Sequence, residues 1–260
     1  MLKQLLGNTG ISLSALGSYY GNPVRIYMPD WVSEERVKLM KMYNAEVILI
    51  SKEEGGFIKA INEAKEYAKN NNAFYADQFE NTDNLLAHYE TTGLEIENQV
   101  KEKIGGFVSG IGTGGTLIGT SKRLKETYPD MKVYALEPDK MPLLSKNQII
   151  GSHRIEGIGD EFIPKLVDRK LIDEVIEIND EDAINMSRLI ATKLGIGVGI
   201  SAGANMIASV IAKNSNEDAI VTVFPDDNKK YLSTELSRPV DLNKSFFSNK
   251  IELIEYELIR

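Results

Sequence analysis

The sequence predicts an α/β protein with two lobes, each a mostly parallel sheet flanked by helices. Short, nearly all-apolar runs alternate with helix-like segments, which is typical of parallel strands buried on both faces. A polar stretch at residues 80–84 interrupts this alternation and marks a boundary between the lobes. With 260 residues, of which 42% are hydrophobic, the chain can bury a sizeable core in one or two domains.

The smaller lobe is predicted over residues 1–80. Residues 24–28, 46–50 and 73–76 are rich in strand-forming residues and are expected to be parallel strands. Between the first two, Ser33 is expected to cap a helix that begins with two acidic residues. A second helical pattern covers residues 57–68, which completes a βαβαβ run.

The larger lobe is predicted over residues 81–242. Its expected strands are residues 106–109, 132–137, 174–178 and 219–224, with a helix at 116–127 and further helices between the later strands. The tail, residues 243–260, alternates apolar and charged residues from Lys250 onward, so an edge strand and a helix both remain open. Because ligands of such folds sit at the carboxyl ends of strands and often between lobes, we expect one cleft lined by glycine-rich loops.

Composition excludes several classes of function. A formal net charge of −8 argues against nucleic-acid binding, which needs a basic face. The chain has no cysteine and two distant histidines, so no metal site and no cysteine nucleophile are expected. It has no apolar run near the roughly 18 residues of a membrane span and no secretory signal at its start, so a cytoplasmic protein is expected.

The sharpest local signal is the sequence G-I-G-T-G-G-T at residues 110–116, between an expected strand and an expected helix. Glycines let the backbone approach an anion closely, and the amide groups of a helix N-terminus attract it. Gly110, Gly112 and Gly115 also satisfy the dinucleotide pattern, with Glu137 placed where a ribose-binding acid would stand. A nicotinamide-dependent Rossmann oxidoreductase and a tight turn without a ligand therefore stay open here, although two threonines suit a single terminal phosphate better.

Six segments in a fixed order carry a wider resemblance. They read G-N-T-G at 7–10, Q-F-E-N at 78–81 followed by His88 and T-T-G at 91–93, G-T-G-G-T at 112–116, H-R-I-E-G-I-G-D-E-F-I-P at 153–164, G-I-S-A-G at 199–203, and P-D with Y-L-S at 225–233. Together they resemble the fold-type II pyridoxal-phosphate family of cysteine synthase and cystathionine β-synthase. The resemblance runs from Gly7 to about residue 234 and implies the tryptophan synthase β-like fold.

The resemblance implies a role for each matching residue. Pyridoxal 5'-phosphate would be the cofactor, and its phosphate would bind Gly112, Thr113, Gly114, Gly115 and Thr116. Asn8 would contact the phenolic oxygen of the cofactor and Ser201 its pyridine nitrogen, while Thr9, Gln78 and Gly157 would bind a small amino-acid substrate. In isolation Ser201 would be interpreted as a helix N-cap and Gln78 as a surface amide. His88 is expected to be a structural helix residue and not a catalyst. Glu137 with Pro138 also matches a family segment, which weakens its ribose-binding interpretation.

One family feature has no counterpart in this sequence. The residues 7–10 resemble the asparagine loop of the family, which carries its Schiff-base lysine well before this loop in a motif like S-x-K-D-R. Here only six residues precede Gly7, with Lys3 the one lysine among them. We therefore expect a fold incomplete at its N-terminus and a chain that is inactive as given. Residues 1–8 can be encoded by a DNA sequence that, after removal of a single G and in another reading frame, encodes Val-Lys-Ala-Thr-Ser-Gly-Asn. Family members typically have A-T-S-G-N at this point. Residues 1–6 are therefore interpreted as an out-of-frame reading of an intact gene. A shortened, non-catalytic interaction fragment is the alternative.

Asp160 and Glu161 bear on the reaction. Cysteine synthases have small residues at this point of the family pattern, whereas a carboxylate would repel bisulfide and could act as a general base toward water. One hypothesis is therefore a cysteine desulfhydrase or lyase that releases sulfide from L-cysteine and forms serine, with Asp160 as the base. The other is an ordinary cysteine synthase that acts on O-acetyl-L-serine, with Asp160 facing solvent. Both stay open, and the resemblance implies a homodimer with no nucleic-acid or membrane partner.

Overall fold

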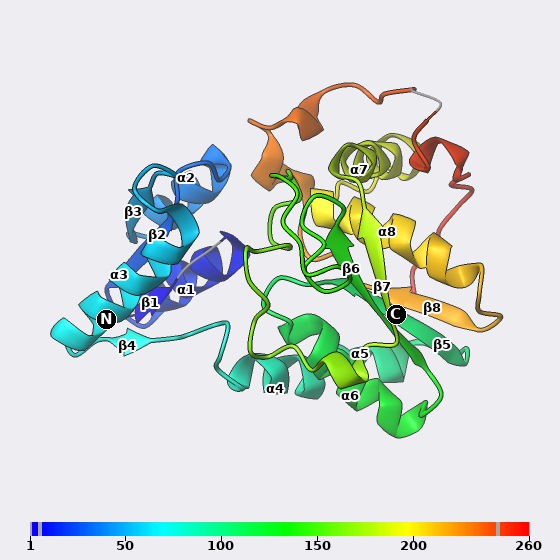
Figure 1. Cartoon of the computed structure of the whole chain (residues 1–260), viewed down its shortest axis with the longest axis horizontal. Coiled ribbons are helices and arrows are strands. Elements are labelled where there is room, and N and C mark those ends of the chain that lie inside the picture. The colour runs from blue at the N-terminus through cyan, green and yellow to red at the C-terminus, as the bar shows by residue number, and fades with distance from the viewer. Residues whose placement is uncertain (1, 5–6, 243–244, 260) are drawn as a thin grey trace. The chain divides into compact units, whose positions relative to one another are not determined.

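The computed structural model describes residues 2–4, 7–242 and 245–259, which fall into two compact units (Figure 1). Unit 1 contains the described residues up to Gln78 together with Lys229–Thr234, and unit 2 contains Phe79–Asn228 and the rest of the chain from Glu235. Each unit is built on a four-stranded parallel sheet, so the predicted α/β class with parallel sheets flanked by helices is confirmed.

The sheet of unit 1 has the strand order β3-β2-β1-β4. Its strands are β1 (Leu2–Gln4), β2 (Val24–Pro29), β3 (Glu46–Ile50) and β4 (Phe74–Tyr75), and its helices are α1 (Gly7–Tyr19), α2 (Glu34–Met42) and α3 (Gly56–Asn70). Because side chains of a strand alternate between faces, Ile26 and Met28 lie in one buried cluster with Met40 of α2, while Tyr27 lies in another with Ala60 of α3. The sheet of unit 1 is thus covered by helices on both faces.

The sheet of unit 2 has the strand order β7-β6-β5-β8. Its strands are β5 (Ile104–Gly110), β6 (Lys132–Pro138), β7 (Glu174–Ile178) and β8 (Ala219–Thr222). Its helices are α4 (Asp83–Glu90), α5 (Thr92–Gln99), α6 (Gly115–Thr127), α7 (Asp180–Leu194) and α8 (Ile200–Lys213). Short 3₁₀ turns occur at Arg169–Leu171, Asn228–Tyr231, Glu235–Ser237 and Ser248–Lys250, and the second of them spans the boundary between the two units. Figure 1 shows α4–α6 on one side of this sheet and α7 and α8 on the other.

The core of unit 2 lies beneath the first strand-to-helix connection. Phe107 of β5 and Leu117 and Leu124 of α6 are fully buried with Val133 and Ala135 of β6. Packing of α6 against these two central strands fixes the carboxyl end of β5 and the start of α6, where the glycine loop lies.

The segment Lys229–Thr234 belongs to unit 1, although the sequence placed residues 81–242 in one lobe. Glu35, in the first turn of α2, accepts hydrogen bonds from the Ser233 amide (3.0 Å) and hydroxyl (2.7 Å). The next residue, Arg36, is 2% exposed; its guanidinium donates to the Lys230 carbonyl at 3.3 Å and lies 4.4 Å from the centre of the Tyr231 ring. The start of α2 therefore binds a segment distant in sequence.

Three local expectations differ from the structure. Ser33 occupies the N-cap position of α2 but makes no capping bond; its buried hydroxyl instead accepts from Arg36 at 2.7 Å. Residues 7–10, expected as a loop, form the first turn of α1. The described tail residues 251–259 are neither strand nor helix, so neither alternative for the tail is found.

No helix within the described residues is both long and apolar enough to cross a membrane.

Candidate active site

The glycine loop, residues 110–116, comprises the end of β5, the connection at 111–114 and the first two residues of α6 in unit 2. Gly114 has φ +88°, which favours glycine, and a Cβ on Gly112 would stand 2.2 Å from the Gly157 carbonyl oxygen. Within the described residues, the following loop amides donate to no protein acceptor: Gly112, Thr113, Gly114 and Thr116. Unsatisfied amides at the start of a helix attract an anion, so this loop fits a phosphate group.

Helix α4 supports the two threonines of the loop. Asn84 donates to the Thr113 hydroxyl oxygen at 2.9 Å, and this oxygen also accepts from the Gly115 amide at 3.2 Å. The hydroxyl of Thr116 lies 3.2 Å from Nε2 of His88, whose Nδ1 lies 3.0 Å from the Thr92 hydroxyl. Burial lowers the pKa of His88, so a neutral imidazole holds Thr116 at neutral pH.

Ser201 lies in the first turn of α8 and is 5% exposed. The N-cap of this helix is Gly199, so the interpretation of Ser201 as an N-cap is wrong. Asn205, one turn later, was not predicted from the sequence: its amide oxygen accepts from the Gly110 amide at 2.9 Å and its nitrogen donates to the Val223 carbonyl at 2.8 Å. A lone asparagine in an apolar helix carries no sequence signal for this role, which is to tie the end of β5 to the end of β8.

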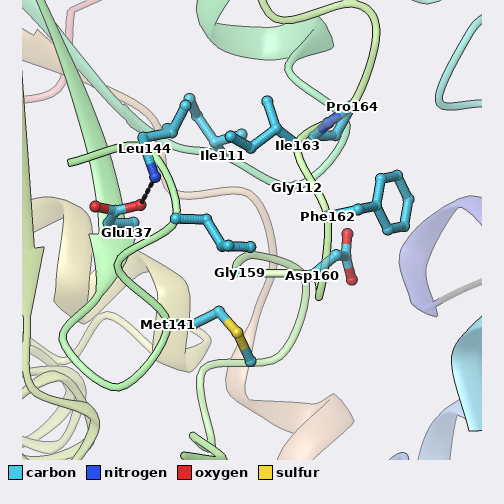
Figure 2. Close-up of a pocket in the computed structure, with 11 residues that line it drawn as sticks. Ile111, Gly112, Glu137, Met141, Leu144, Gly159, Asp160, Phe162, Ile163 and Pro164 are labelled. Carbon is cyan, nitrogen blue, oxygen red and sulfur yellow. Dashed lines mark hydrogen bonds between the residues drawn. The ribbon is translucent and has the colours of Figure 1, made fainter. Parts of the chain in front are cut away.

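A small pocket in unit 2 brings the glycine loop and the predicted base together (Figure 2). The pocket is lined by Ile111 and Gly112 of the glycine loop, by Phe162 and by Gly159 and Asp160 of the later segment. Burial, reinforced by the nearby Glu161 carboxylate, raises the pKa of Asp160 to about 7. A carboxyl with this pKa is partly ionised at neutral pH and can accept a proton there.

The segment that carries Asp160 is anchored at its start by ion pairs to a buried carboxylate. The Asp180 carboxylate accepts from Lys140 (2.8 Å) and from the Arg154 side chain (2.9 Å) and backbone (3.1 Å). Burial alone would raise the pKa of Asp180, but these bonds and charges outweigh it and lower the pKa to about 2. Asp180 is therefore ionised throughout the neutral range, and Arg154 is fixed beside it.

Glu137 has a role that the dinucleotide interpretation did not foresee. Its carboxylate is 3% exposed and accepts from the Leu144 amide (2.7 Å), the Ser145 amide (3.0 Å) and the Ser145 hydroxyl (2.5 Å). Figure 2 shows the Leu144 bond. A buried carboxylate engaged in this way holds the turn after β6 and is not available to a ribose, so the ribose-binding interpretation is wrong.

Three predicted site residues belong to unit 1. Asn8 and the exposed Thr9 lie in the first turn of α1, and the buried Gln78 ends the N-terminal stretch of this unit. Gly157, the glycine loop, Asp160 and Ser201 all belong to unit 2. That these residues of unit 1 and unit 2 form one site is still a prediction.

No group of histidine, cysteine, aspartate and glutamate side chains suited to a metal ion occurs in the described part of the chain.

Comparisons with known proteins distinguish between the two cofactors, a dinucleotide and pyridoxal phosphate, that the glycine loop allowed. The family model described as "Pyridoxal-phosphate dependent enzyme" matches residues 5–226. Cysteine synthase B of Campylobacter jejuni is 41% identical over 232 residues, which cover 88% of this chain and 77% of the relative. These matches favour pyridoxal phosphate over a dinucleotide as the ligand of the loop.

Two solved structures are similar over the whole chain. A hydrogen sulfide-producing enzyme from Fusobacterium nucleatum is 48% identical with a TM-score of 0.94, and the match covers 100% of this chain and 79% of that one. An aspartate-to-asparagine variant of that enzyme, in its lysine-dimethylated form and complexed with an α-aminoacrylate intermediate, is 47% identical with a TM-score of 0.95 and matched coverage of 100% and 80%.

Proposed function

Because the chain belongs to the family of pyridoxal-phosphate dependent enzymes and is of the cysteine synthase type, we propose that it converts L-cysteine and water to L-serine and hydrogen sulfide. Asp160 is the base toward the water. The observation that carries the proposal is a carboxyl with a pKa of about 7 in the wall of a pocket that Ile111 and Gly112 of the glycine loop also line.

The residues of the glycine loop fit the cofactor. Gly112, Thr113, Gly114, Gly115 and Thr116 would hold its phosphate, since the loop offers unsatisfied amides and two hydroxyls fixed from α4. Ser201 would contact the pyridine nitrogen with a neutral hydroxyl, and Asn8 the phenolic oxygen. Bound pyridoxal phosphate supplies the electron sink that permits elimination at the β-carbon of an amino acid.

Asp160 acts on water after sulfide has left. As a carboxylate it removes a proton from the water molecule that adds to the β-carbon, and its pKa of about 7 matches this task at neutral pH. Together with Glu161 it also repels the bisulfide anion, which disfavours the reverse addition of sulfide. The similar hydrogen sulfide-producing enzyme supports a first step that releases sulfide, because one of its solved structures contains an α-aminoacrylate intermediate.

The substrate is a small amino acid. Thr9 and Gln78 would bind its carboxylate with uncharged donors, and Gly157 would also contact the substrate. A cytoplasmic homodimer completes the proposal, and sedimentation equilibrium of the purified protein tests the assembly.

Cysteine synthase activity is the second candidate, favoured by the identity with cysteine synthase B. The test is to supply L-cysteine alone, or O-acetyl-L-serine with sulfide, and to measure sulfide, serine and cysteine. The assay uses the protein loaded with pyridoxal phosphate. We expect equal amounts of sulfide and serine from L-cysteine. Cysteine formation from O-acetyl-L-serine without sulfide release from L-cysteine would favour the synthase instead.

A further inference from the structure

The imidazole of His153 uses both of its nitrogens. The backbone amide of Ile155 donates to Nδ1 at 3.2 Å, so Nδ1 is an acceptor and the proton of the neutral ring resides on Nε2. Nε2 then donates to the carbonyl of Gly159 at 2.9 Å. Burial lowers the pKa of His153, which keeps the ring in this neutral, bridging form at neutral pH.

Gly159 is fixed from several sides. Its amide donates to the carbonyl of Ile111, in the glycine loop, at 3.0 Å. Its φ is +71°, and a Cβ at this position would stand 2.6 Å from Cγ of Pro138 and 2.8 Å from Nε2 of His153. His153 and Pro138 therefore enclose Gly159, and only glycine fits between them.

The fixed group adjoins the proposed base. The carbonyl of Gly159 and the amide of Asp160 belong to one planar peptide unit, so a bond to that carbonyl limits the rotation of the unit that carries Asp160. Among the described residues, His153 is the one side chain that donates to this carbonyl. The bond from the Gly159 amide to the Ile111 carbonyl holds the preceding peptide unit against the glycine loop, so Gly159 is held on both sides.

We propose that His153 is a positioning residue that orients Asp160 toward the site of water addition. The inference rests on the proposed function of Asp160, because misplacing a base by about 1 Å costs roughly a hundredfold in rate. Nothing in this role requires His153 to contact substrate or cofactor.

The first test needs no turnover. The chain has two histidines, so a His153→Gln variant assigns their ring signals in nitrogen NMR. We expect His153 to carry its proton on Nε2 in the wild-type protein. A proton on Nδ1 would overturn the proposal, whatever the variants do.

The second test uses two amide variants that each replace one nitrogen of the ring. Glutamine reaches far enough to donate to the Gly159 carbonyl, whereas asparagine reaches only the position of Nδ1. In His153→Asn, hydrogen exchange of the Gly159 amide should accelerate by about tenfold or more, while the Ile118 amide in α6 stays unchanged. His153→Gln should resemble the wild type. Equal exchange in all three proteins would refute the positioning role.

The third test measures products from L-cysteine in the cofactor-loaded protein. After loss of sulfide, addition of water at the β-carbon gives serine. If water does not add there, the product is released and hydrolysed to pyruvate and ammonia. The ratio of serine to pyruvate therefore reports how well the base is oriented toward the water. In His153→Asn we expect this ratio to fall by about tenfold or more while sulfide release changes by less than about threefold. His153→Gln should keep the wild-type ratio.

The outcomes separate the two proposals. An unchanged ratio in His153→Asn, with faster Gly159 exchange, refutes the positioning of Asp160 by His153. A wild-type protein that makes pyruvate but no serine refutes the base role of Asp160, while the ring tautomer and the exchange data still decide whether His153 fixes Gly159.

Discussion

Replacing Asp160 by asparagine removes an ionisable carboxyl and keeps nearly the same side-chain volume. The first half of the reaction, loss of sulfide, does not use this carboxyl, so one equivalent of sulfide per site should still appear in the first turnover. The addition of water should slow by about 10²–10⁴-fold, the usual contribution of a general base. Steady-state serine formation should fall by the same factor.

The pKa of the group sets the pH dependence of the wild-type protein. With a pKa of about 7, the ionised fraction of Asp160 rises from about 0.09 at pH 6 to about 0.91 at pH 8. Serine formation should therefore increase about tenfold across this range, because only the carboxylate can accept the proton. In Asp160→Asn this dependence should disappear.

Rapid mixing with L-cysteine, followed by sulfide and serine determination, measures both halves of the reaction. Glu161→Gln is the matched control, because it removes the neighbouring charge and leaves the base. It should keep serine formation and shift the pH midpoint to lower values, since Glu161 contributes to the raised pKa. An Asp160→Asn protein that forms serine at the full rate would refute the base role.

Two further predictions concern the framework of unit 2. The folded pKa of Asp180 is about 2, below its ordinary 3.8, so its ionisation stabilises the fold above pH 4, and roughly 2 kcal/mol should be lost as the pH falls from 4 to 2. Acid unfolding of wild-type protein and Asp180→Asn should differ in that window, and equal profiles would contradict the assignment. A Gly112→Ala change places a methyl group 2.2 Å from the Gly157 carbonyl oxygen and should weaken pyridoxal-phosphate binding by about tenfold or more. Gly151→Ala, with no atom within 4 Å of the added carbon, is its control, and equal affinities by equilibrium dialysis would show that the loop tolerates a side chain.

Much of the fold could be predicted because the relevant signals are local. Strand β7 (Glu174–Ile178) coincides with the predicted range, and β3 (Glu46–Ile50) does too, since a short apolar run between polar turns indicates a buried parallel strand. Helix α6 begins one residue before the predicted start, where the glycine loop ends. The order of the family motifs predicted the cofactor class, which family membership confirms.

What the sequence did not predict depends on distant partners. Ser33 stands at a helix start, but the hydroxyl is used by Arg36, and no local pattern distinguishes the two uses. Asn205 joins the ends of two strands, and the Lys229–Thr234 segment joins unit 1 across most of the chain length. His153 was noticed only as part of a motif, because its two bonds arise from the path of the following residues.

The discontinuity of unit 1 has a practical consequence for anyone dividing this protein into pieces. A polypeptide ending at Gln78 would retain α2 but lose the Lys230 carbonyl and the Tyr231 ring that Arg36 contacts. Burying a guanidinium with fewer partners is costly, so such a fragment should expose Arg36 and aggregate or remain partly unfolded. Supplying the hexapeptide 229–234, by covalent linkage or in trans, is the minimum needed to restore the partners of Arg36 in unit 1.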